Sequence, residues 1–314
     1  MNTSIILQTI IPLLILPALL THQTTKLLMT HTKLVARDLH KPGQPRIPTL
    51  GGLAILAGIP PPLTLVYLTT RQAEYLATAA TLAAVATIGF LDDLYQFKQT
   101  KKVALTTLAS TPLLLLPLLG RLETTILGYN IGLLYYPIVI LGITGAANAT
   151  NMLAGFNGLE TGITTIATIG ILISALITNN TNVATIATIT LVALLTFLHH
   201  NHYPAKIFPG NAGTLQMGAI MACMVIIGKI EYIGPVLVLP HMVDLTLKSR
   251  AGFATRKLGP ASLNPNGTLA PPPYPSLLGF VMRRKSVTEP QLVNYMWLIE
   301  ALCTGLAITL VCLA

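Results

Sequence analysis

Long apolar stretches separated by short polar connections run along the whole of this chain. Each stretch has about 17–23 residues, close to the roughly 20 that an α-helix needs to cross a membrane. The pattern predicts ten spanning helices, at about 4–22, 48–70, 75–91, 103–119, 131–147, 159–178, 182–198, 212–228, 230–247 and 292–313. We therefore expect an all-α polytopic membrane protein that forms one domain over residues 1–314.

Composition and charge agree with a membrane protein. The chain is 53% hydrophobic and 9% charged, whereas soluble domains are roughly 25% charged. With ten spans, the connections at 23–47, 92–102, 148–158, 199–211 and 248–291 share one side and carry 16 of the 19 Lys and Arg residues. The positive-inside rule makes that side cytoplasmic and puts both termini outside the cell membrane. Topology and contact with anionic lipids explain the net charge of +9, so no nucleic acid is needed.

The polar run from Asn148 to Glu160 is the most informative segment. It places three asparagines, two glycines and one carboxylate between two apolar stretches. An unsatisfied polar group in lipid costs several kcal/mol, so the run must face water, protein or a ligand. Amide side chains both donate and accept hydrogen bonds, which suits a nucleobase, a sugar or a diphosphate. The run is either a polar turn between helices or part of a binding site.

Carboxylates are scarce, and two of the ten are adjacent at the end of the third stretch, Asp92 and Asp93. Two such charges at a membrane boundary repel each other unless a cation or water relieves them. Three lysines follow in a short connection, and the returning fourth stretch can bring Lys102 back toward the pair. The segment is either a structural salt-bridge cluster or part of a site.

Other polar features occur in connections of the same side. Gly51 and Gly52 open the second stretch and allow close backbone approach. The segment 206–214 opens the eighth stretch with a turn whose amides could hold an anion. Polar residues gathered on one membrane face favour a single cytoplasmic site. A transporter, or a lipid-binding membrane protein without catalysis, is the competing reading, although transporters commonly place polar residues near the midplane.

Taken together, these residues resemble the polyprenyl-phosphate N-acetylhexosamine-1-phosphate transferase family. The resemblance covers essentially the whole chain, from Pro48-Thr-x-Gly-Gly to the tenth stretch. Its most specific parts are the run from Asn148 to Gly162 and the motif His200-Asn-x-Tyr-Pro-x-x-x-Phe208-x-Gly. Both are more similar to the archaeal and eukaryotic N-acetylglucosamine branch than to the muramyl branch. The small size and a Leu-Asn-Pro-x-Gly-Thr-Leu run look archaeal.

The resemblance implies an activity and site residues. Family members transfer a sugar 1-phosphate from a UDP-sugar to a polyprenyl or dolichyl phosphate, release UMP and use Mg²⁺. This chain would transfer N-acetylglucosamine 1-phosphate, the step that starts N-glycan assembly. By motif position, the implied roles are Mg²⁺ binding for Asn151, uridine reading for Asn157 with its neighbour Glu160, uracil stacking for Phe208, diphosphate contact for Asp92, Asp93 and Lys102, and a further substrate contact for Asn148.

Two departures from the family pattern stand out. The Arg-His-Arg signature of the last cytoplasmic connection is absent, and Arg256 is the nearest candidate in register. The family normally has an aspartate that ligates Mg²⁺ where this chain has Asn211. An amide oxygen can bind Mg²⁺ but brings no charge. Either Asp92 or Asp93 helps, or the substrate diphosphate holds the metal, or the activity is lost.

The chemistry can also be argued without the family. A phosphate monoester has a second pKa near about 6, so a polyprenyl phosphate is mostly a dianion at neutral pH. It gains little from a general base, and positioning and charge neutralisation matter more. A two-step route through an aspartyl-phosphate intermediate stays open. The sequence also leaves open the exact sugar, the lipid length and whether the chain forms a homodimer.

Overall fold

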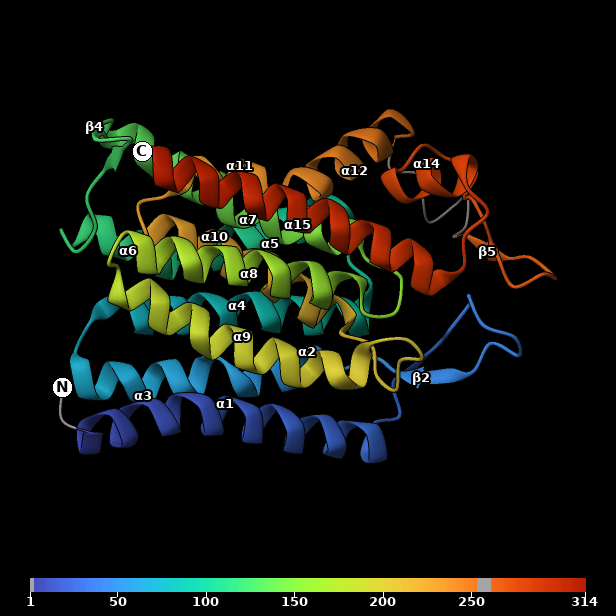
Figure 1. Cartoon of the computed structure of the whole chain (residues 1–314), viewed down its shortest axis with the longest axis horizontal. Helices are drawn as coiled ribbons and strands as arrows, with labels where there is room; N and C mark the ends of the chain where they lie inside the picture. Colours follow the sequence, from blue (N-terminus) through green and yellow to red (C-terminus); the bar gives the residue numbers. More distant parts are fainter. Residues whose placement is uncertain (1–2, 253–260) are drawn as a thin grey trace.

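The computed structural model describes residues 3–252 and 261–314, with side chains from residue 13 onward. Most helices run side by side along one direction, and short hairpins lie at their ends (Figure 1). The helices are α1 (Thr3–His31), α2 (Gly52–Gly58), α3 (Pro60–Thr70), α4 (Ala73–Tyr95), α5 (Gln99–Ala109), α6 (Thr111–Leu118), η1 (Gly132–Leu134), α7 (Tyr135–Leu153), α8 (Leu159–Ile177), α9 (Thr181–Asn201), α10 (Gly210–Ile227), η2 (Glu231–Ile233), α11 (Gly234–Leu237), α12 (Leu239–Arg250), α14 (Leu277–Arg284) and α15 (Glu289–Leu313). Three antiparallel hairpins pair β1 (Val35–Arg37) with β2 (Arg46–Pro48), β3 (Thr125–Ile126) with β4 (Tyr129–Asn130), and β5 (Ser262–Leu263) with β6 (Leu269–Ala270).

The all-α polytopic class is confirmed, but the expected number of ten spans is wrong. Seven segments of the described chain are helical, long and apolar enough to cross a membrane. The expected span 103–119 is broken into α5 and α6, and the span 230–247 into η2, α11 and α12. Each break lies beside a proline, such as Pro112, which lacks the N–H that would continue a helix. The third expected span that is not among these seven, 4–22, lies in α1, and the first side chains of α1 are outside the described part of the chain.

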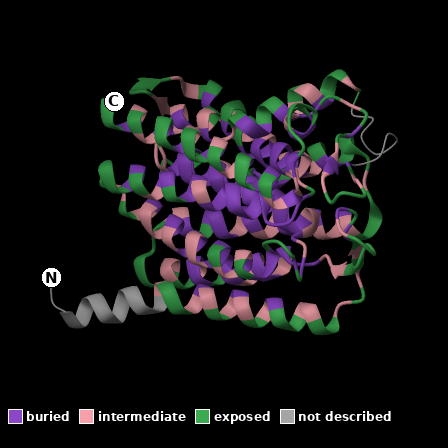
Figure 2. Cartoon of the chain, turned by 45° about the vertical axis from the view of Figure 1, so that its right-hand side comes forward, coloured by how far each residue is buried: buried purple, intermediate pink, exposed green. Residues whose placement is uncertain are grey.

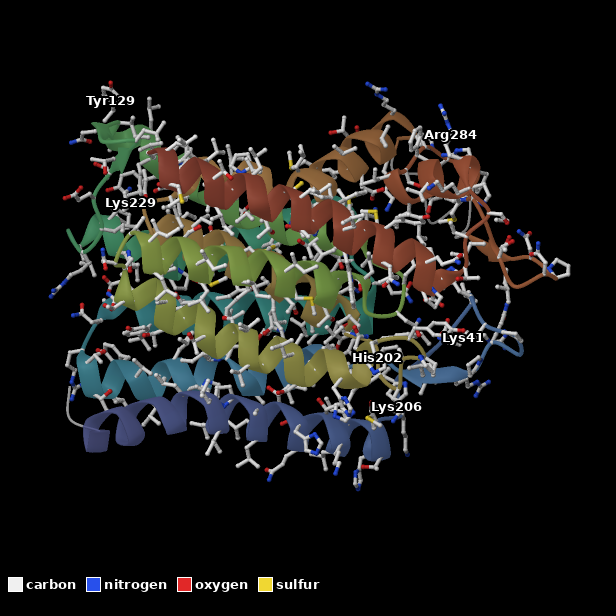
Figure 3. All side chains as sticks on the ribbon, viewed as in Figure 1. Lys41, Tyr129, His202, Lys206, Lys229 and Arg284 are labelled. Carbon is white, nitrogen blue, oxygen red and sulfur yellow. The ribbon has the colours of Figure 1, made fainter. Side chains whose placement is uncertain are left out.

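The two ends of the bundle differ in what they carry. α1 begins and α15 ends at one end, together with the β3–β4 hairpin (Figure 1). The β1–β2 hairpin, the β5–β6 hairpin, α14 and the end of α9 lie at the other end. Figure 3 shows Lys41, His202, Lys206 and Arg284 at this second end, whereas Lys229 lies at the first. The polar connections that we expected on one face therefore gather at one end of the bundle.

Helix α10 lies at the centre of the bundle, and 89% of its residues are buried. Buried residues fill the middle of the molecule, while exposed ones lie on its outside (Figure 2). Glycines let neighbouring backbones approach α10 closely: a Cβ on Gly52 would lie 2.1 Å from the backbone N of Gly213, and one on Gly89 2.5 Å from Cα of Ala212. Small residues at such contacts are typical of packing inside membranes. The close approach expected at Gly52 is confirmed, and it fixes the start of α10.

Candidate active site

A cavity of about 1010 Å³ opens at the polar end of the bundle. Its wall is built from the segment around β1, the end of α4, the end of α7 with the turn that follows it, and the start of α10. Seven of the predicted site residues line it: Asp92, Asp93, Asn151, Asn157, Glu160, Phe208 and Asn211. Packing thus brings together residues that the sequence places in three separate connections.

Asp93 joins α4 to the first turn of α10. Its Oδ1 accepts hydrogen bonds from the backbone N of Asn211 at 2.9 Å and from Nδ2 of the same residue at 2.8 Å. Its Oδ2 accepts from the backbone N of Ala212 at 3.2 Å. The first N–H groups of a helix have no partner inside it, and the helix dipole favours a negative charge there. The carboxylate of Asp93 is therefore fixed at the cavity wall by α10.

Two amide side chains line the cavity together with this carboxylate. Asn151, at the end of α7, accepts a hydrogen bond at Oδ1 from Oγ1 of Thr214, one turn into α10, at 2.7 Å. Asn211 gives its Nδ2 to Asp93, so its Oδ1 is left for other partners. Two amide oxygens and one carboxylate are hard oxygen donors, the kind that Mg²⁺ takes in proteins. The residues present fit a magnesium ion, with Asp93 as the source of negative charge.

Asp92, in the cavity wall, forms a buried ion pair with Lys102 behind it. Nζ of Lys102 lies 2.6 Å from Oδ2 of Asp92, and Oδ1 accepts from the backbone N of Phe97 at 2.7 Å. Asp92 is 1% exposed and Lys102 is 3% exposed. The return of the hairpin toward the aspartates is therefore confirmed. Lys102 does not line the cavity, so it can act on a substrate through Asp92 rather than by contact.

Besides Lys102, two predicted residues are not among those that the structure places at the cavity. Asn148 is buried one turn deeper in α7, where its Nδ2 donates to Oγ1 of Thr106 and to the carbonyl of Thr144, both at 2.9 Å. This side chain holds α5 against α7 and is not among the lining residues. Its role as a substrate contact stays a prediction. Arg256 lies outside the described residues.

Phe208 is held at the cavity by its backbone. Its N–H donates to the carbonyl of Pro48 at 2.7 Å, and its carbonyl accepts from Gly51 at 2.9 Å. These bonds tie the segment before α10 to the start of α2. The half-buried ring of Phe208 lines the cavity, so an aromatic face is available there. Stacking on a base remains a prediction that this position permits.

The turn between α7 and α8, residues 154–158, is held by buried polar groups. Glu160 accepts a hydrogen bond from the backbone N of Gly155, and Nε1 of Trp297 donates to the carbonyl of Gly158 at 3.3 Å. Gly155 has a φ of 140°, which side-chain-bearing residues rarely adopt, and a Cβ there would meet nothing within 4 Å. Bare backbone therefore faces the cavity at Gly155.

Asn157 uses most of its polar atoms inside the protein. Its Oδ1 accepts from Nζ of Lys41 and from the backbone N of Ala205, the latter at 2.7 Å. Its Nδ2 donates to Oδ2 of Asp38 at 3.2 Å, and its backbone N donates to Oε1 of Glu289 at 2.7 Å. The residue is 3% exposed. The predicted uridine-reading side chain is thus also the centre of a protein network.

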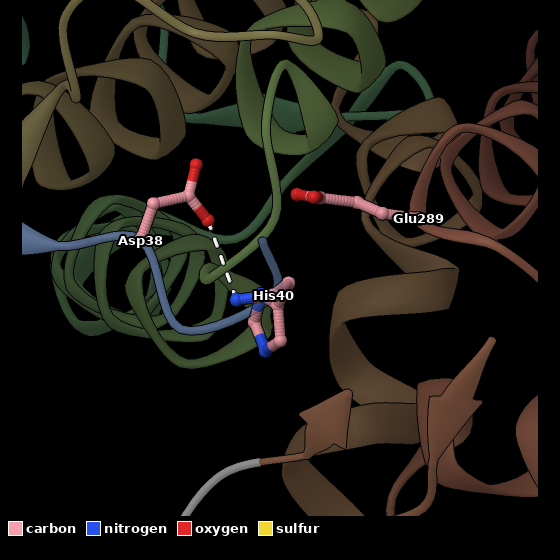
Figure 4. A group of neighbouring side chains, drawn as sticks. All are labelled: Asp38, His40 and Glu289. Atoms are coloured by element: carbon pink, nitrogen blue, oxygen red, sulfur yellow. Dashed lines mark hydrogen bonds between the residues drawn. The ribbon is translucent and has the colours of Figure 1, made fainter. Parts of the chain in front are cut away.

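That network includes a donor set that could hold a metal ion. Ligand atoms of Asp38, His40 and Glu289 all lie within 4.8 Å of one another, and Figure 4 shows Glu289 reaching toward the other two. However, the ammonium of Lys41 contacts Asp38 and lies 3.9 Å from Oε2 of Glu289. The ammonium of Lys41 already occupies the space between the two carboxylates and offsets one of their charges, so we assign the cluster a structural role rather than a metal.

His40 adds an aromatic face to the same wall. Its ring stacks on Phe156, with centroids 4.4 Å apart and planes 15° from parallel, and both residues line the cavity. Burial lowers the pKa of His40 below its usual value of 6.5, and the neighbouring Asp38 opposes that shift. The neutral imidazole therefore dominates in the folded protein at neutral pH.

Asp38, His40, Lys41 and Glu289 were not among the residues predicted from the sequence. One signal existed: Arg37-Asp38-Leu-His40-Lys41 is unusually rich in charge for a chain with 9% charged residues. Glu289 gave no comparable signal, because it looks like an ordinary acidic residue in the first turn of a helix. Its contact with Asn157 joins positions 132 residues apart.

Comparison with known proteins adds to this geometry. The sequence profile of glycosyl transferase family 4 matches residues 75–229, which include Asp93, Asn151, Phe208 and Asn211. The chain is 33% identical over 294 residues to a putative UDP-N-acetylglucosamine–dolichyl-phosphate N-acetylglucosaminephosphotransferase of Saccharolobus solfataricus, covering 89% of this chain and 88% of that one.

Two further relatives extend the comparison. A putative glycosyltransferase of Methanocaldococcus jannaschii is 34% identical over 269 residues, with 83% of each chain covered. A phospho-N-acetylmuramoyl-pentapeptide-transferase of Heliobacterium modesticaldum is 31% identical over 205 residues, covering 60% of this chain and 63% of that one. The similarity to the first two relatives reaches beyond residues 75–229 into most of the chain.

Proposed function

Because the chain belongs to glycosyl transferase family 4, whose members transfer a sugar 1-phosphate from a UDP-sugar to a polyprenyl phosphate, we propose that its sugar is N-acetylglucosamine and its lipid a dolichyl-type phosphate. The observation that carries this choice is the 33% identity over 89% of the chain to a protein named for that reaction. The family sets aside the reading as a transporter. The choice of sugar and lipid rests on relatives alone.

The bond changes define what the site has to do. An oxygen of the lipid phosphate forms a bond to the β-phosphorus of the UDP-sugar, and the bond from that phosphorus to the bridging oxygen breaks, so UMP leaves. Both reactants are anions, so the main difficulty is to bring them together in line. Asp93, fixed on α10, and Asn151, fixed on α7, provide oxygens at set positions on the cavity wall. Phe208 and the backbone of Gly155 offer flat surfaces to the nucleoside half.

Mg²⁺ is part of this proposal. Asn151, Asn211 and Asp93 would hold it, and when bound it would neutralise charge on the diphosphate. Asp93 would have a second task, since it also orients Asn211 through the hydrogen bond from Nδ2. Asp92, next to Asp93 in the cavity wall, would be held in place by its buried ion pair with Lys102. We favour this positioning role over general base catalysis, because the lipid phosphate is already a dianion.

We also propose that the cavity end is cytoplasmic. The connections that meet there hold most of the Lys and Arg residues, as the positive-inside rule requires. Both ends of the described chain would then lie outside. The similarity to archaeal relatives supports an archaeal enzyme that supplies the first lipid-linked sugar of N-glycan assembly.

The deciding experiment measures UMP release by the purified chain in lipid nanodiscs. UDP-N-acetylglucosamine, dolichyl phosphate and Mg²⁺ should give UMP and an equal amount of lipid-linked sugar. UDP-N-acetylgalactosamine and the UDP-muramyl pentapeptide, offered under the same conditions, should react more slowly. The variant Asp93→Asn serves as the inactive control. Preference for another UDP-sugar would overturn the sugar assignment, and no turnover with any UDP-sugar would mean that the chain has lost the family's activity.

A further inference from the structure

The side chain of Lys41 connects three separate parts of the chain. Its Nζ contacts Oδ2 of Asp38 and Oδ1 of Asn157, and lies 3.9 Å from Oε2 of Glu289. The same nitrogen lies 4.6 Å from the centre of the Tyr203 ring. Lys41 therefore joins the segment after β1, the turn 154–158 and the start of α15.

The two carboxylates of this group share the positive charge of Lys41. Asp38 is 2% exposed and Glu289 is 3% exposed, and a buried carboxylate needs a cation and hydrogen bonds. Asp38 uses its second oxygen for the backbone N of His40 at 3.4 Å. Glu289 uses Oε1 for the backbone N of Asn157. Without Lys41, both carboxylates and Oδ1 of Asn157 would lose their shared cation.

The position of the group relative to the cavity gives it a function. Asp38, His40, Phe156 and Asn157 all line the cavity, whereas Lys41 and Glu289 stand behind them. Two hydrogen bonds fix the orientation of the Asn157 side chain from the protein side, through Lys41 and the backbone of Ala205. What a ligand meets on this wall is therefore set by the charged group behind it.

We propose that Lys41, together with Asp38 and Glu289, is a positioning residue that holds the 154–158 turn in its cavity-lining form and so sets the affinity for the nucleoside half of the UDP-sugar. This inference rests on the proposed function, since it assigns the nucleoside to this wall. The proposed positioning role differs from a purely structural role in which substrate it affects. Under the proposed function, the bond changes and the lipid phosphate belong beside Asp93 and the start of α10. A looser turn should therefore weaken binding of the UDP-sugar and leave binding of the lipid phosphate unchanged.

The experiment compares Lys41→Met with wild type in three measurements: the KM of the UDP-sugar, the KM of the lipid phosphate, and the Kd of UMP by calorimetry. The UDP-sugar KM and the UMP Kd should rise at least about tenfold, while kcat and the lipid KM stay within about threefold, the pattern of lost ground-state binding. Lys41→Arg, which keeps the charge, should recover most of the affinity. Lys33→Met, an exposed lysine in the same connection, is the matched control and should behave like wild type.

A second variant tests how the two carboxylates depend on the shared cation. Glu289→Gln removes one of the two carboxylates but keeps an oxygen that can accept from Asn157. The double variant Lys41→Met with Glu289→Gln should therefore bind UMP more tightly than Lys41→Met alone. If Lys41→Met does not fold, the double variant is compared with wild type instead. The KM of the UDP-sugar should then rise while the KM of the lipid phosphate stays unchanged.

The outcomes separate the two proposals. If wild type neither binds UMP nor turns over a UDP-sugar, the proposed function fails, and the inference fails with it. If wild type is active but Lys41→Met leaves the UDP-sugar KM unchanged, the positioning role alone is refuted. Equal losses for both substrates, in proportion to the folded fraction, would also refute it, because they would show a structural role only.

Discussion

The substitution Asn211→Asp probes the metal position most directly. In the structure, Nδ2 of Asn211 donates to Oδ1 of Asp93 at 2.8 Å. Aspartate has nearly the same size, so it would turn this hydrogen bond into a contact between two carboxylates. Unit charges about 4 Å apart interact by about 4 kcal/mol at an effective dielectric of about 20. The lost hydrogen bond adds about 1 kcal/mol. Side-chain rotation and proton uptake relieve part of this repulsion, so we expect a loss of about 2–4 kcal/mol of unfolding free energy without metal.

Magnesium should reverse this loss. Two carboxylates and the amide oxygen of Asn151 form a better magnesium site than one carboxylate and two amides, since Mg²⁺ is bound chiefly through carboxylates in proteins. An ion that binds only the folded state raises the free energy of unfolding once the ion concentration exceeds its Kd. The assay is thermal unfolding of both forms in EDTA and in rising Mg²⁺, with UMP release titrated in parallel. Asn211→Asp should unfold at a lower temperature in EDTA, gain more from Mg²⁺ and reach half-maximal activity at lower Mg²⁺.

A matched control separates the metal from the general cost of a buried carboxylate. Asn148→Asp changes another asparagine near the cavity, but one that is bonded to Thr106 and Thr144 and does not line the wall. It should be destabilised equally with and without Mg²⁺. The reasoning is refuted if wild type and Asn211→Asp show superimposable Mg²⁺ dependence of both unfolding and UMP release.

Three further predictions follow from the geometry. Lys102→Met should cost about 3–5 kcal/mol of stability, because it leaves Asp92 unpaired. The double variant with Asp92→Asn should fold again, while its UMP release stays about 100-fold below wild type. Full turnover by the double variant would show that this hairpin is not part of the site. Phe208→Ala should weaken UDP-sugar binding by about 1–3 kcal/mol in calorimetry and leave the affinity for the lipid phosphate unchanged. If the UDP-sugar affinity is unchanged and the protein is less stable, the ring has only a structural role. Because the pKa of His40 is lowered, the unfolded state binds more protons, so unfolding temperature should fall as pH drops below about 6.5; His40→Phe should flatten that slope, and an unchanged slope would assign it to other groups.

Local patterns predicted some parts of the site well. The close approach at Gly52 follows from two adjacent glycines, because only a residue without Cβ lets two helix backbones meet. The pairing of Lys102 with Asp92 follows from the length of the connection between two helices. The surroundings of that pair were predicted less well. The sequence places the pair at a membrane boundary, where a cation or water could relieve its charges. In the structure the pair is almost fully buried, because α5 folds back over the end of α4.

The number of spans shows where hydrophobicity alone misleads. Mean apolarity over a stretch predicts that it is buried, but it does not distinguish one long helix from two short ones. Pro112 divides the stretch 103–119 without changing its apolarity. A proline does not always prevent a segment from spanning the membrane. Pro60 opens α3 directly after α2, and α2 and α3 together are still long and apolar enough to cross it. The outcome depends on how the broken ends pack, which is tertiary information.

Asn157 shows the remaining limit of sequence reasoning. The sequence correctly marks this amide as a group that needs both a donor and an acceptor, but it does not say whether those partners belong to a ligand or to the protein. In the structure Oδ1 is taken by Lys41 and Ala205, and one hydrogen of Nδ2 by Asp38. A nucleobase can therefore meet only the second Nδ2 hydrogen of this side chain. The partners come from the segment after β1 and from the segment between α9 and α10, so only folding brings them together. Recognition at this wall then depends on how firmly those partners hold the turn. Lys41 lies outside every sequence motif that we used, and for this reason it becomes the residue to test.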